Sequence, residues 1–410
     1  MSRYLRWLLA VLLVPAVLAI AACGGDDDSG GSSTGASTES AEAGGDPIVI
    51  GAAIAESGFL APFDLPPLAA AQFAIDDINA DGGVLGRPLE LVTADMKSEP
   101  SQGPQAALDV LGQGAEMVIV SCDFDTGSPA AVTATGEGKI AFSTCAGAPQ
   151  FGPQGIGPLA YTMGAAGQTE GAIMAEFAVE SKGFETAYVM TNTDLEYFKN
   201  VASGFQDAYP QAGGEIVGQA NFKQDDPAAT VVNKFLSVEP TPDALFLAAN
   251  PSFAGEVLRR VRASGYDGPI LGSNSWDGDY WKDGFPNLSE LYYLGYISLY
   301  GDDPNPQANE LVERYQEAEG QLPDNSNLVT GYSVIQAFAK AAEAAGDIEG
   351  EALAAELDTF DDADLLVGPT TFTPELHISI ERPMQVMQIQ DGESSFVETW
   401  TPSYVPEVDL

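Results

Sequence analysis

From Pro47 to about residue 264, the chain alternates between short apolar runs and longer stretches with helical patterning. The first run, residues 48–54, predicts a buried strand, and a helix is predicted from residue 66 to 80 because Pro66 and Pro67 suit a first helical turn. Further strands are predicted at 89–94, 117–120, 140–143, 187–191 and 244–249, and further helices at 104–111, 129–136, 168–181, 198–209, 227–238 and 253–264. Such alternation is typical of parallel sheets covered by helices. The strands are too many for one open sheet of ordinary size, which favours an α/β fold with two doubly wound lobes.

The first residues of the chain predict export and lipid attachment. Arg3 and Arg6 form a positive region, and residues 8–20 form an apolar run that falls short of the roughly 20 residues needed to cross a bilayer. Small residues then precede Cys23, a pattern typical of cleavage and lipidation at that cysteine. Residues 1–22 are therefore predicted to be a lipoprotein signal peptide, with a plain membrane anchor as the alternative. The mature protein is expected outside the cytoplasm, held on the cell membrane by lipid on Cys23.

Residues 23–46 begin with this cysteine and are rich in Gly, Ser, Thr, Ala, Asp and Glu. This segment contains no aromatic and no large aliphatic side chain, so it offers nothing to offset the entropy lost on ordering. It is predicted to be a flexible tether between the lipid anchor and the folded body.

The charge of the chain excludes one class of partner. It carries 60 acidic and 16 basic side chains, for a formal net charge of −44, and the only cluster of basic residues is Arg259, Arg260 and Arg262. A surface of this kind repels phosphate, so we expect no binding to nucleic acid.

Two cysteines remain once Cys23 is assigned to lipid. Cys122 and Cys145 would both lie in a compartment that tolerates disulfides, and we predict that they are bonded. Two separate buried thiols are the alternative.

Polar and aromatic residues gather directly after the predicted strands. Ligands of open α/β sheets bind outside the carboxyl ends of the strands, so these segments are the candidates for a binding site. They are residues 55–59 with Phe63 shortly beyond, 121–128, 144–147, 192–197, 250–252 and 273–277.

Enzymatic chemistry finds little support in the sequence. The single histidine, His377, leaves no histidine cluster for zinc, and no Gly-x-Ser-x-Gly motif occurs. The nearest match to a dinucleotide fingerprint starts at Gly155, but it contains Pro158 and follows no strand. Asp123, Asp125, Asp277, Asp279 and Asp283 lack the order of a calcium loop. We therefore expect no catalysis, no metal and no cofactor, with a hydrolase of unrecognised chemistry as an alternative.

One stretch of the sequence carries a specific resemblance. Residues 74–91, AIDDINADGGVLGRPLEL, resemble the first helix and second strand of the leucine/isoleucine/valine-binding and amide-binding group of type I periplasmic binding proteins, which feed ABC importers. Further matches in family order are Tyr197 with Phe205 and Gln206, residues 255–265, Gly331 with Tyr332, and Gly368 with Pro369.

The resemblance implies two lobes joined by a hinge of three crossing strands, near residues 164, 299 and 366. The first lobe would comprise residues 47–163 plus 300–366, and the second residues 164–299 plus 367–410. Such proteins close around their ligand by bending at the hinge.

The function implied by the resemblance is that of a substrate-binding lipoprotein of an ABC importer. It would capture a small molecule, a branched-chain amino acid or an amide, and deliver it to the permease and ATPase complex as a monomer. Two alternatives remain: the same fold with an aromatic or cationic ligand that is not an amino acid, and a sensory protein that presents its ligand to a receptor.

Three positions depart from the side chains with which the family binds amino-acid ligands. The hydroxyls that hold the ligand carboxylate align with Phe124 and Gly147, and the acidic residue that binds the ammonium group aligns with Asn274. A neutral amide cannot supply the charge-assisted bond that a buried ammonium needs.

The predicted site is therefore more aromatic than the family prototype. It suits an apolar or planar ligand with a polar or cationic end near Asp125 or Asp277, while Asp277 could alternatively serve as the ammonium partner of an amino acid. The predicted ligand-binding residues are Phe63, Phe124, Asp125, Thr126, Cys145, Ala146, Gly147, Tyr197, Asn250, Asn274, Trp276 and Asp277.

Overall fold

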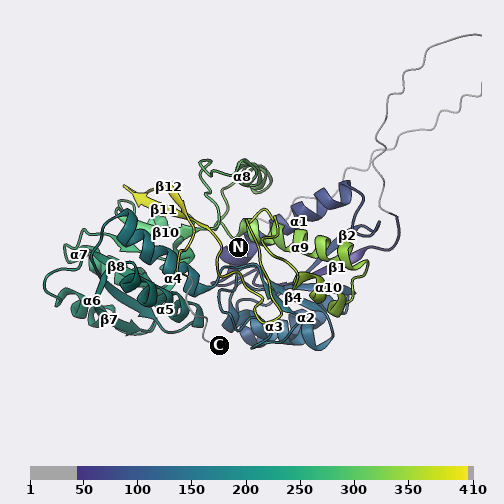
Figure 1. Cartoon of the computed structure of the whole chain (residues 1–410), viewed down its shortest axis with the longest axis horizontal. Coiled ribbons are helices and arrows are strands. Elements are labelled where there is room, and N and C mark those ends of the chain that lie inside the picture. The colour runs from purple at the N-terminus through teal and green to yellow at the C-terminus, as the bar shows by residue number, and fades with distance from the viewer. Residues whose placement is uncertain (1–43, 405–410) are drawn as a thin grey trace, which may run out of the picture. The chain divides into compact units, whose positions relative to one another are not determined.

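The computed structural model describes residues 44–404 and contains two β-sheets with helices packed against them (Figure 1). The five-stranded sheet has the order β2-β1-β3-β4-β5, and its strand pairs are all parallel. Its strands are β1 (Ile48–Ile54), β2 (Leu89–Asp95), β3 (Ala115–Val120), β4 (Ile140–Ser143) and β5 (Ala160–Thr162).

Helices cover both faces of this sheet, and we call the sheet with these helices the first lobe. Ile48 and Ile50 of β1 pack in one apolar cluster with α1 and α9, whereas Ala53 packs in another with α2 and α3. Successive strand residues point to opposite faces, so β1 supplies both clusters. The helices are α1 (Ala61–Ala80), α2 (Gly103–Leu111), α3 (Phe124–Gly136), α9 (Leu328–Ala345) and α10 (Gly350–Leu357).

The seven-stranded sheet has the order β12-β11-β10-β9-β8-β6-β7, and with its helices it forms the second lobe. Its strands are β6 (Thr186–Asn192), β7 (Glu215–Phe222), β8 (Ala244–Ala248), β9 (Ile270–Leu271), β10 (Leu291–Gly295), β11 (Met384–Gln390) and β12 (Glu393–Trp400). Its helices are α4 (Gly167–Glu176), α5 (Glu196–Gln211), α6 (Ala228–Leu236) and α7 (Pro251–Ala263). The prediction of two lobes built on parallel sheets is confirmed.

Several features differ from the sequence-based expectation, which placed no strand at β5, β7, β9 or β10. An antiparallel hairpin, β11 and β12, extends the second sheet, and its turn residues Asp391 and Gly392 have φ values of 54° and 84°, which suit a two-residue hairpin turn. Helix α1 begins at Ala61 and holds Pro66 and Pro67 inside it, so the expected start at residue 66 is wrong. Gly331 of α9 lies directly against the backbone of Pro67, which allows α1 and α9 to pack closely there.

The chain passes between the sheets three times: after β5, after β10 and after α10. The crossings expected near residues 164, 299 and 366 fall within these connections, and the lobe boundaries at 163, 299 and 366 stay a prediction. Helix α8 (Pro306–Glu319) lies in the second connection and packs against α1 and α9.

The predicted signal peptide of residues 1–22, the lipidation of Cys23 and nearly all of the tether of residues 23–46 lie outside the described residues. Within residues 44–404, no helix is both long and apolar enough to cross a membrane.

Candidate functional site

A cavity lies where the two lobes meet, and both lobes line it. The first lobe contributes Leu60, Phe63, Cys122, Asp123, Cys145 and Asn327; the second contributes Glu170, Leu195, Tyr197, Phe198, Asn250, Asn274 and Ser275. Its volume is about 50 Å³. A cavity needs roughly 10–15 Å³ of such volume to hold one water molecule, so this cavity has room for only a few waters.

The ends of the parallel strands build much of this cavity. Cys122 follows β3 and Cys145 follows β4 in the first sheet, while Asn250 follows β8 and Asn274 follows β9 in the second. Ligands of open α/β sheets bind at this edge, so the location agrees with the one expected from the sequence.

The predicted disulfide between Cys122 and Cys145 is confirmed and forms part of the cavity wall. It joins the segments after β3 and β4, with the two Cα atoms 4.6 Å apart. Asp64 fixes the first of these segments further, because its carboxylate accepts from the Cys122 N–H at 2.8 Å and from the Ser121 hydroxyl at 2.6 Å. Burial raises the pKa of Asp64 to about 6.

Glu170 is the most buried carboxylate of the cavity, and α4 carries it there. Its side chain is 2% exposed, and its Oε2 accepts hydrogen bonds from the Tyr197 hydroxyl at 2.7 Å and from the Asn274 N–H at 2.8 Å. Burial raises the pKa of Glu170 from its usual 4.5 to about 7. Both donors are neutral, so neither compensates the charge of the ionised carboxylate with a cation.

Asp123 is a second buried carboxylate, contributed by the first lobe. It caps the N-terminus of α3, where its Oδ1 accepts from the Thr126 N–H at 2.9 Å. Burial and, secondarily, the neighbouring carboxylate of Asp125 raise the pKa of Asp123 to about 6.

Asn327 presents an unpaired acceptor. The residue is fully buried directly before α9, and its Nδ2 lies 2.8 Å from the Cys145 sulfur and 3.3 Å from the Cys122 sulfur. No hydrogen bond from any residue of the described chain reaches its Oδ1. An amide oxygen buried without a donor is costly, which makes it a candidate ligand contact.

Apolar side chains form the remaining wall. Phe63 lies edge-on to the ring of Tyr280 with the centroids 5.9 Å apart, and Tyr197 and Phe198 lie side by side with their centroids 5.4 Å apart. The leucines at positions 60 and 195 complete this surface.

The structure brings five of the twelve predicted ligand residues to the cavity: Phe63, Cys145, Tyr197, Asn250 and Asn274. The other seven lie outside its lining: Phe124, Asp125, Thr126, Ala146, Gly147, Trp276 and Asp277. The ligand contacts themselves stay a prediction.

Three of these seven lie in the first turn of α3. The Phe124 ring packs beside the apolar cluster of the first lobe, and Thr126 donates its N–H to the cap at Asp123. Asp125 reaches the second lobe, where its Oδ2 accepts from the N–H of Glu196 at 2.8 Å. This turn therefore supports the cavity and joins the lobes.

Ala146 and Gly147 form the loop after β4. The Ala146 N–H donates a hydrogen bond to the hydroxyl oxygen of Ser143 at 3.1 Å, and the Gly147 carbonyl accepts one from the Gly167 N–H at 2.7 Å. A Cβ at position 147 would lie 2.8 Å from the Tyr197 ring. Glycine is therefore needed there for Tyr197 to occupy its place in the wall.

Trp276 and Asp277 turn away from the cavity. The Trp276 indole is fully buried in the core of the second lobe and donates to the Leu247 carbonyl at 3.2 Å. Asp277 is 1% exposed, and its two oxygens accept from the N–H groups of Gly278 and Ser326, each at 2.8 Å. Burial raises the pKa of Asp277 to about 7.

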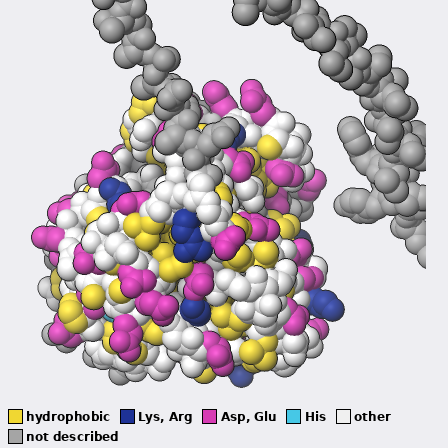
Figure 2. Space-filling view, turned by 90° about the vertical axis from the view of Figure 1, so that its right-hand side faces the viewer, with side chains coloured by type: hydrophobic (Ala, Val, Ile, Leu, Met, Phe, Trp, Pro, Cys, Tyr) yellow, Lys and Arg dark blue, Asp and Glu magenta, His cyan; other side chains and the backbone are white. Residues whose placement is uncertain are grey.

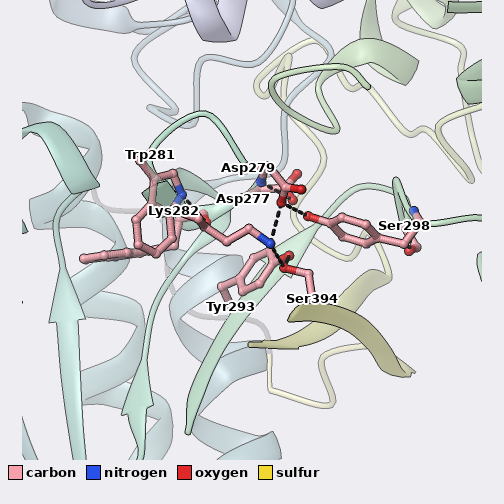
Figure 3. Close-up of polar contacts among 10 residues, drawn as sticks. Asp277, Asp279, Trp281, Lys282, Tyr293, Ser298 and Ser394 are labelled. Atoms are coloured by element: carbon pink, nitrogen blue, oxygen red, sulfur yellow. Dashed lines mark hydrogen bonds and ion pairs between the residues drawn. The ribbon is translucent and has the colours of Figure 1, made fainter. Parts of the chain in front are cut away.

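Asp277 borders a polar cluster that stabilises the second lobe (Figure 3). In this cluster Lys282 forms an ion pair with Asp279 and donates to the hydroxyl of Ser394 at 2.9 Å, while the Tyr300 hydroxyl donates to Asp279 at 2.7 Å. The cluster thus ties the loop after β9 to β12.

Eight cavity residues were missed as ligand contacts, although Cys122 among them was predicted as a disulfide partner. Cys122, Asp123, Leu195 and Ser275 lie in segments that the sequence had marked. Glu170 gave a weaker signal as an acidic residue at the start of an otherwise apolar helical stretch. The other three are Leu60, Phe198 and Asn327.

A larger hollow of about 540 Å³ lies between α1, α8, α9 and residues 364–366. Its lining mixes acidic and basic side chains, and the ion pair of Arg314 with Asp77 lies within it at 2.7 Å. Unlike the cavity between the lobes, it does not lie at the carboxyl ends of the strands, and one lobe with α8 makes its whole lining.

Comparisons with known proteins agree with the fold and with the resemblance described above. The chain is similar to the Leu/Ile/Val-binding protein BraC3 of Rhizobium johnstonii, with 24% identity over 327 residues that cover 77% of this chain and 86% of the relative. It is also similar to the leucine-, isoleucine-, valine-, threonine- and alanine-binding protein of Pseudomonas aeruginosa, with 24% identity over 76% of this chain and 82% of that protein.

Two solved structures show the same fold. The branched-chain amino acid transporter substrate-binding protein LivJ of Streptococcus pneumoniae, in complex with isoleucine, superposes with a TM-score of 0.75 at 22% identity, covering 87% of this chain and all of LivJ. A solute-binding protein of an ABC transporter from Rhodopseudomonas palustris, in complex with 3,4-dihydroxybenzoic acid, gives a TM-score of 0.71 at 18% identity, covering 88% and 99%.

A family model for periplasmic binding proteins matches residues 47–394, which span both lobes and every residue of the cavity lining. The chain belongs to the periplasmic binding protein family.

Proposed function

We propose that this protein is an extracytoplasmic substrate-binding lipoprotein of an ABC importer. It captures a small organic molecule between its two lobes and delivers it, chemically unchanged, to the permease. The observation that carries the proposal is the cavity at the carboxyl ends of the strands, to which both lobes contribute side chains.

Direct contacts between the lobes support capture by closure. Asp125 accepts from the Glu196 N–H at 2.8 Å, and the rings of Phe59 and Phe253 lie 5.9 Å apart between centroids. The cavity of about 50 Å³ is too small for free entry of an amino acid. A ligand of that size therefore enters when the lobes separate, and closing contacts hold it afterwards.

The names of the relatives indicate which classes of compound should be tested first as ligands. Several are named for leucine, isoleucine and valine, while solved structures of the same fold hold isoleucine or 3,4-dihydroxybenzoic acid. Branched-chain amino acids are therefore the first class to test, together with the amides that the sequence resemblance also implies. An aromatic or cationic compound is the second, because neutral or apolar residues replace the family's side-chain anchors at 124, 147 and 274.

The single histidine is buried and packs against other residues outside the cavity lining. His377 is 1% exposed, its ring stacks on that of Tyr161 with centroids 3.8 Å apart, and its Nδ1 lies 2.8 Å from the Ala160 carbonyl oxygen. It is not among the residues that line the cavity. Binding without catalysis is consistent with this arrangement.

The surface suits a partner other than nucleic acid. On the face in Figure 2, acidic side chains are spread widely and the few basic side chains do not form a continuous track. A surface of this kind repels a phosphate backbone, so the proposed partners are the importer subunits and a small ligand.

The test is a thermal-shift screen of the soluble body from Pro47 onward, refolded to remove carried-over ligand. A ligand at a hundred times its dissociation constant adds about 2.7 kcal/mol to the free energy of unfolding, which raises Tm by several degrees. The proposal predicts such a shift for at least one compound among amino acids, amides, amines and aromatic acids. If none shifts Tm, and native mass spectrometry of protein purified without refolding detects no bound compound, the proposal fails.

A further inference from the structure

We propose that the cavity is selective for a small organic cation, a primary ammonium on an apolar body, that has no carboxylate beside it. This inference rests on the proposed function and names the ligand class of the same site. It depends on the arrangement of free acceptors, occupied donors and apolar walls in the cavity.

The free polar atoms of the cavity are mainly acceptors. Glu170 receives both of its hydrogen bonds at Oε2, and Asp123 receives its one at Oδ1, so no bond from the described residues reaches Glu170 Oε1 or Asp123 Oδ2. The buried Oδ1 of Asn327 likewise has no donor there. An ammonium group carries three N–H donors and no acceptor, which matches such a set.

Three donors in or beside the cavity are already occupied. The Cys122 N–H donates to Asp64 at 2.8 Å and the Ala146 N–H to Ser143 at 3.1 Å. The hydroxyl of Tyr197 donates to Glu170. A ligand carboxylate would therefore compete with protein acceptors for every one of these groups.

No cation in the described chain neutralises the two carboxylates. None of the residues that line the cavity is Lys or Arg. The titratable groups facing Glu170 are the phenols of Tyr197 and Tyr296, and those facing Asp123 are the carboxylates of Asp64 and Asp125. A second negative group from a ligand would add repulsion, whereas a ligand cation would supply the missing charge.

The buried Arg382 does not fill this role. Its guanidinium donates to the Met163 carbonyl, to the Thr370 hydroxyl and to the Ser379 hydroxyl, at 2.8, 2.8 and 3.0 Å. It is not part of the cavity lining.

The other wall of the cavity accommodates an apolar body. Leu60, Phe63, Leu195 and Phe198 provide aliphatic and aromatic carbon opposite the polar atoms. The preferred ligand is therefore a small alkyl or aryl amine, with its ammonium at Glu170, Asp123 and Asn327.

The test compares compounds that differ only in the carboxylate: 3-methylbutylamine against leucine, and 2-phenylethylamine against phenylalanine. Isothermal titration calorimetry of the refolded body from Pro47 onward should show the preferred amine binding at least tenfold more tightly than its amino acid. Tighter binding of the amino acid would overturn the inference while supporting the proposed function.

Substitutions of the two cavity carboxylates test where the ammonium group of the ligand binds. Glu170→Gln keeps the shape and an acceptor for Tyr197 and Asn274, and Asp123→Asn keeps a good helix cap, so both should fold. Each should weaken amine binding at least tenfold. The control Glu176→Gln lies on the same helix outside the cavity, where its carboxylate accepts from Trp400, and should leave affinity unchanged. Unchanged affinity in both cavity variants would overturn the assignment.

Failure of the inference and failure of the proposed function give different results. If neither amines nor amino acids bind, but native mass spectrometry of the unrefolded protein shows a bound acid or neutral compound, the cation inference is wrong and the function stands. If no small molecule binds under either condition, both are wrong.

Discussion

Glu170 should make the stability of the protein depend on pH, in the direction opposite to that of an ion-paired carboxylate. Its pKa is raised by burial from 4.5 to about 7 in the folded protein. Between pH 4.5 and pH 7, Glu170 therefore holds a proton in the folded state that it has released in the unfolded chain. The free energy of unfolding therefore falls as pH rises from 4.5 to 7, and this contribution is constant outside that window.

The size of the effect follows from the two pKa values. At about 1.4 kcal/mol per pKa unit, the contribution of Glu170 between pH 5 and pH 8 is roughly 2–3 kcal/mol. The Glu170→Gln variant does not titrate and retains an oxygen acceptor for the Tyr197 hydroxyl and the Asn274 N–H. Its free energy of unfolding, relative to wild type, should therefore increase by roughly this amount from pH 5 to pH 8.

The assay is urea denaturation of both proteins at pH 5, 6, 7 and 8, without ligand and with the disulfide intact. Subtracting the two curves at each pH removes the contributions of Asp64, Asp123 and Asp277, whose pKa values burial also raises. A difference between variant and wild type that stays constant from pH 5 to pH 8 would refute the reasoning, because Glu170 would then titrate alike in the folded and unfolded states.

Three further changes test the fold and the anchor. Gly204→Ala would place a Cβ against the carbonyl oxygen of Gln168, where α4 and α5 pack closely, and should lower the free energy of unfolding by about 3 kcal/mol in urea denaturation. Gly255→Ala, whose Cβ would meet no atom closer than 3.7 Å, is the control and should not destabilise. Reduction of the disulfide, which closes a loop with a sequence separation of 23, should cost about 3 kcal/mol in the same assay, and an unchanged count of alkylatable thiols would show that the bond is absent. Cys23→Ala should abolish the incorporation of labelled fatty acid into the protein in cells, and incorporation that persists in the variant would exclude Cys23 as the lipidated residue.

Local pattern was sufficient to predict the architecture. The apolar runs predicted six of the twelve strands of the described chain, β1, β2, β3, β4, β6 and β8. The rule that ligands bind at the carboxyl ends of strands led to Cys145, Asn250 and Asn274. Cysteine count and compartment predicted the disulfide. These inferences depend on short segments whose position in the fold follows from strand order.

The direction of individual side chains was harder to predict. Trp276 and Asp277 follow a strand end as expected, but a short 3-10 helix, η3 (Asn274–Trp276), turns the indole into the core. Glu170 comes from the helix after the first crossing, and only the packing of α4 on α5 brings it to Tyr197. Asn327 reaches the disulfide from a segment 182 residues beyond Cys145. No local pattern encodes such long-range placements.

The central claim, that two lobes close on a small ligand, is tested most directly by hydrogen–deuterium exchange across the contact between them. The Glu196 N–H donates to Asp125 of the opposite lobe at 2.8 Å, so it is protected only while the lobes are closed. Saturation with the compound that gives the largest thermal shift should slow exchange in the peptide containing residues 193–199, and Asp125→Ala should reduce that protection. Equal exchange with and without bound ligand would contradict closure.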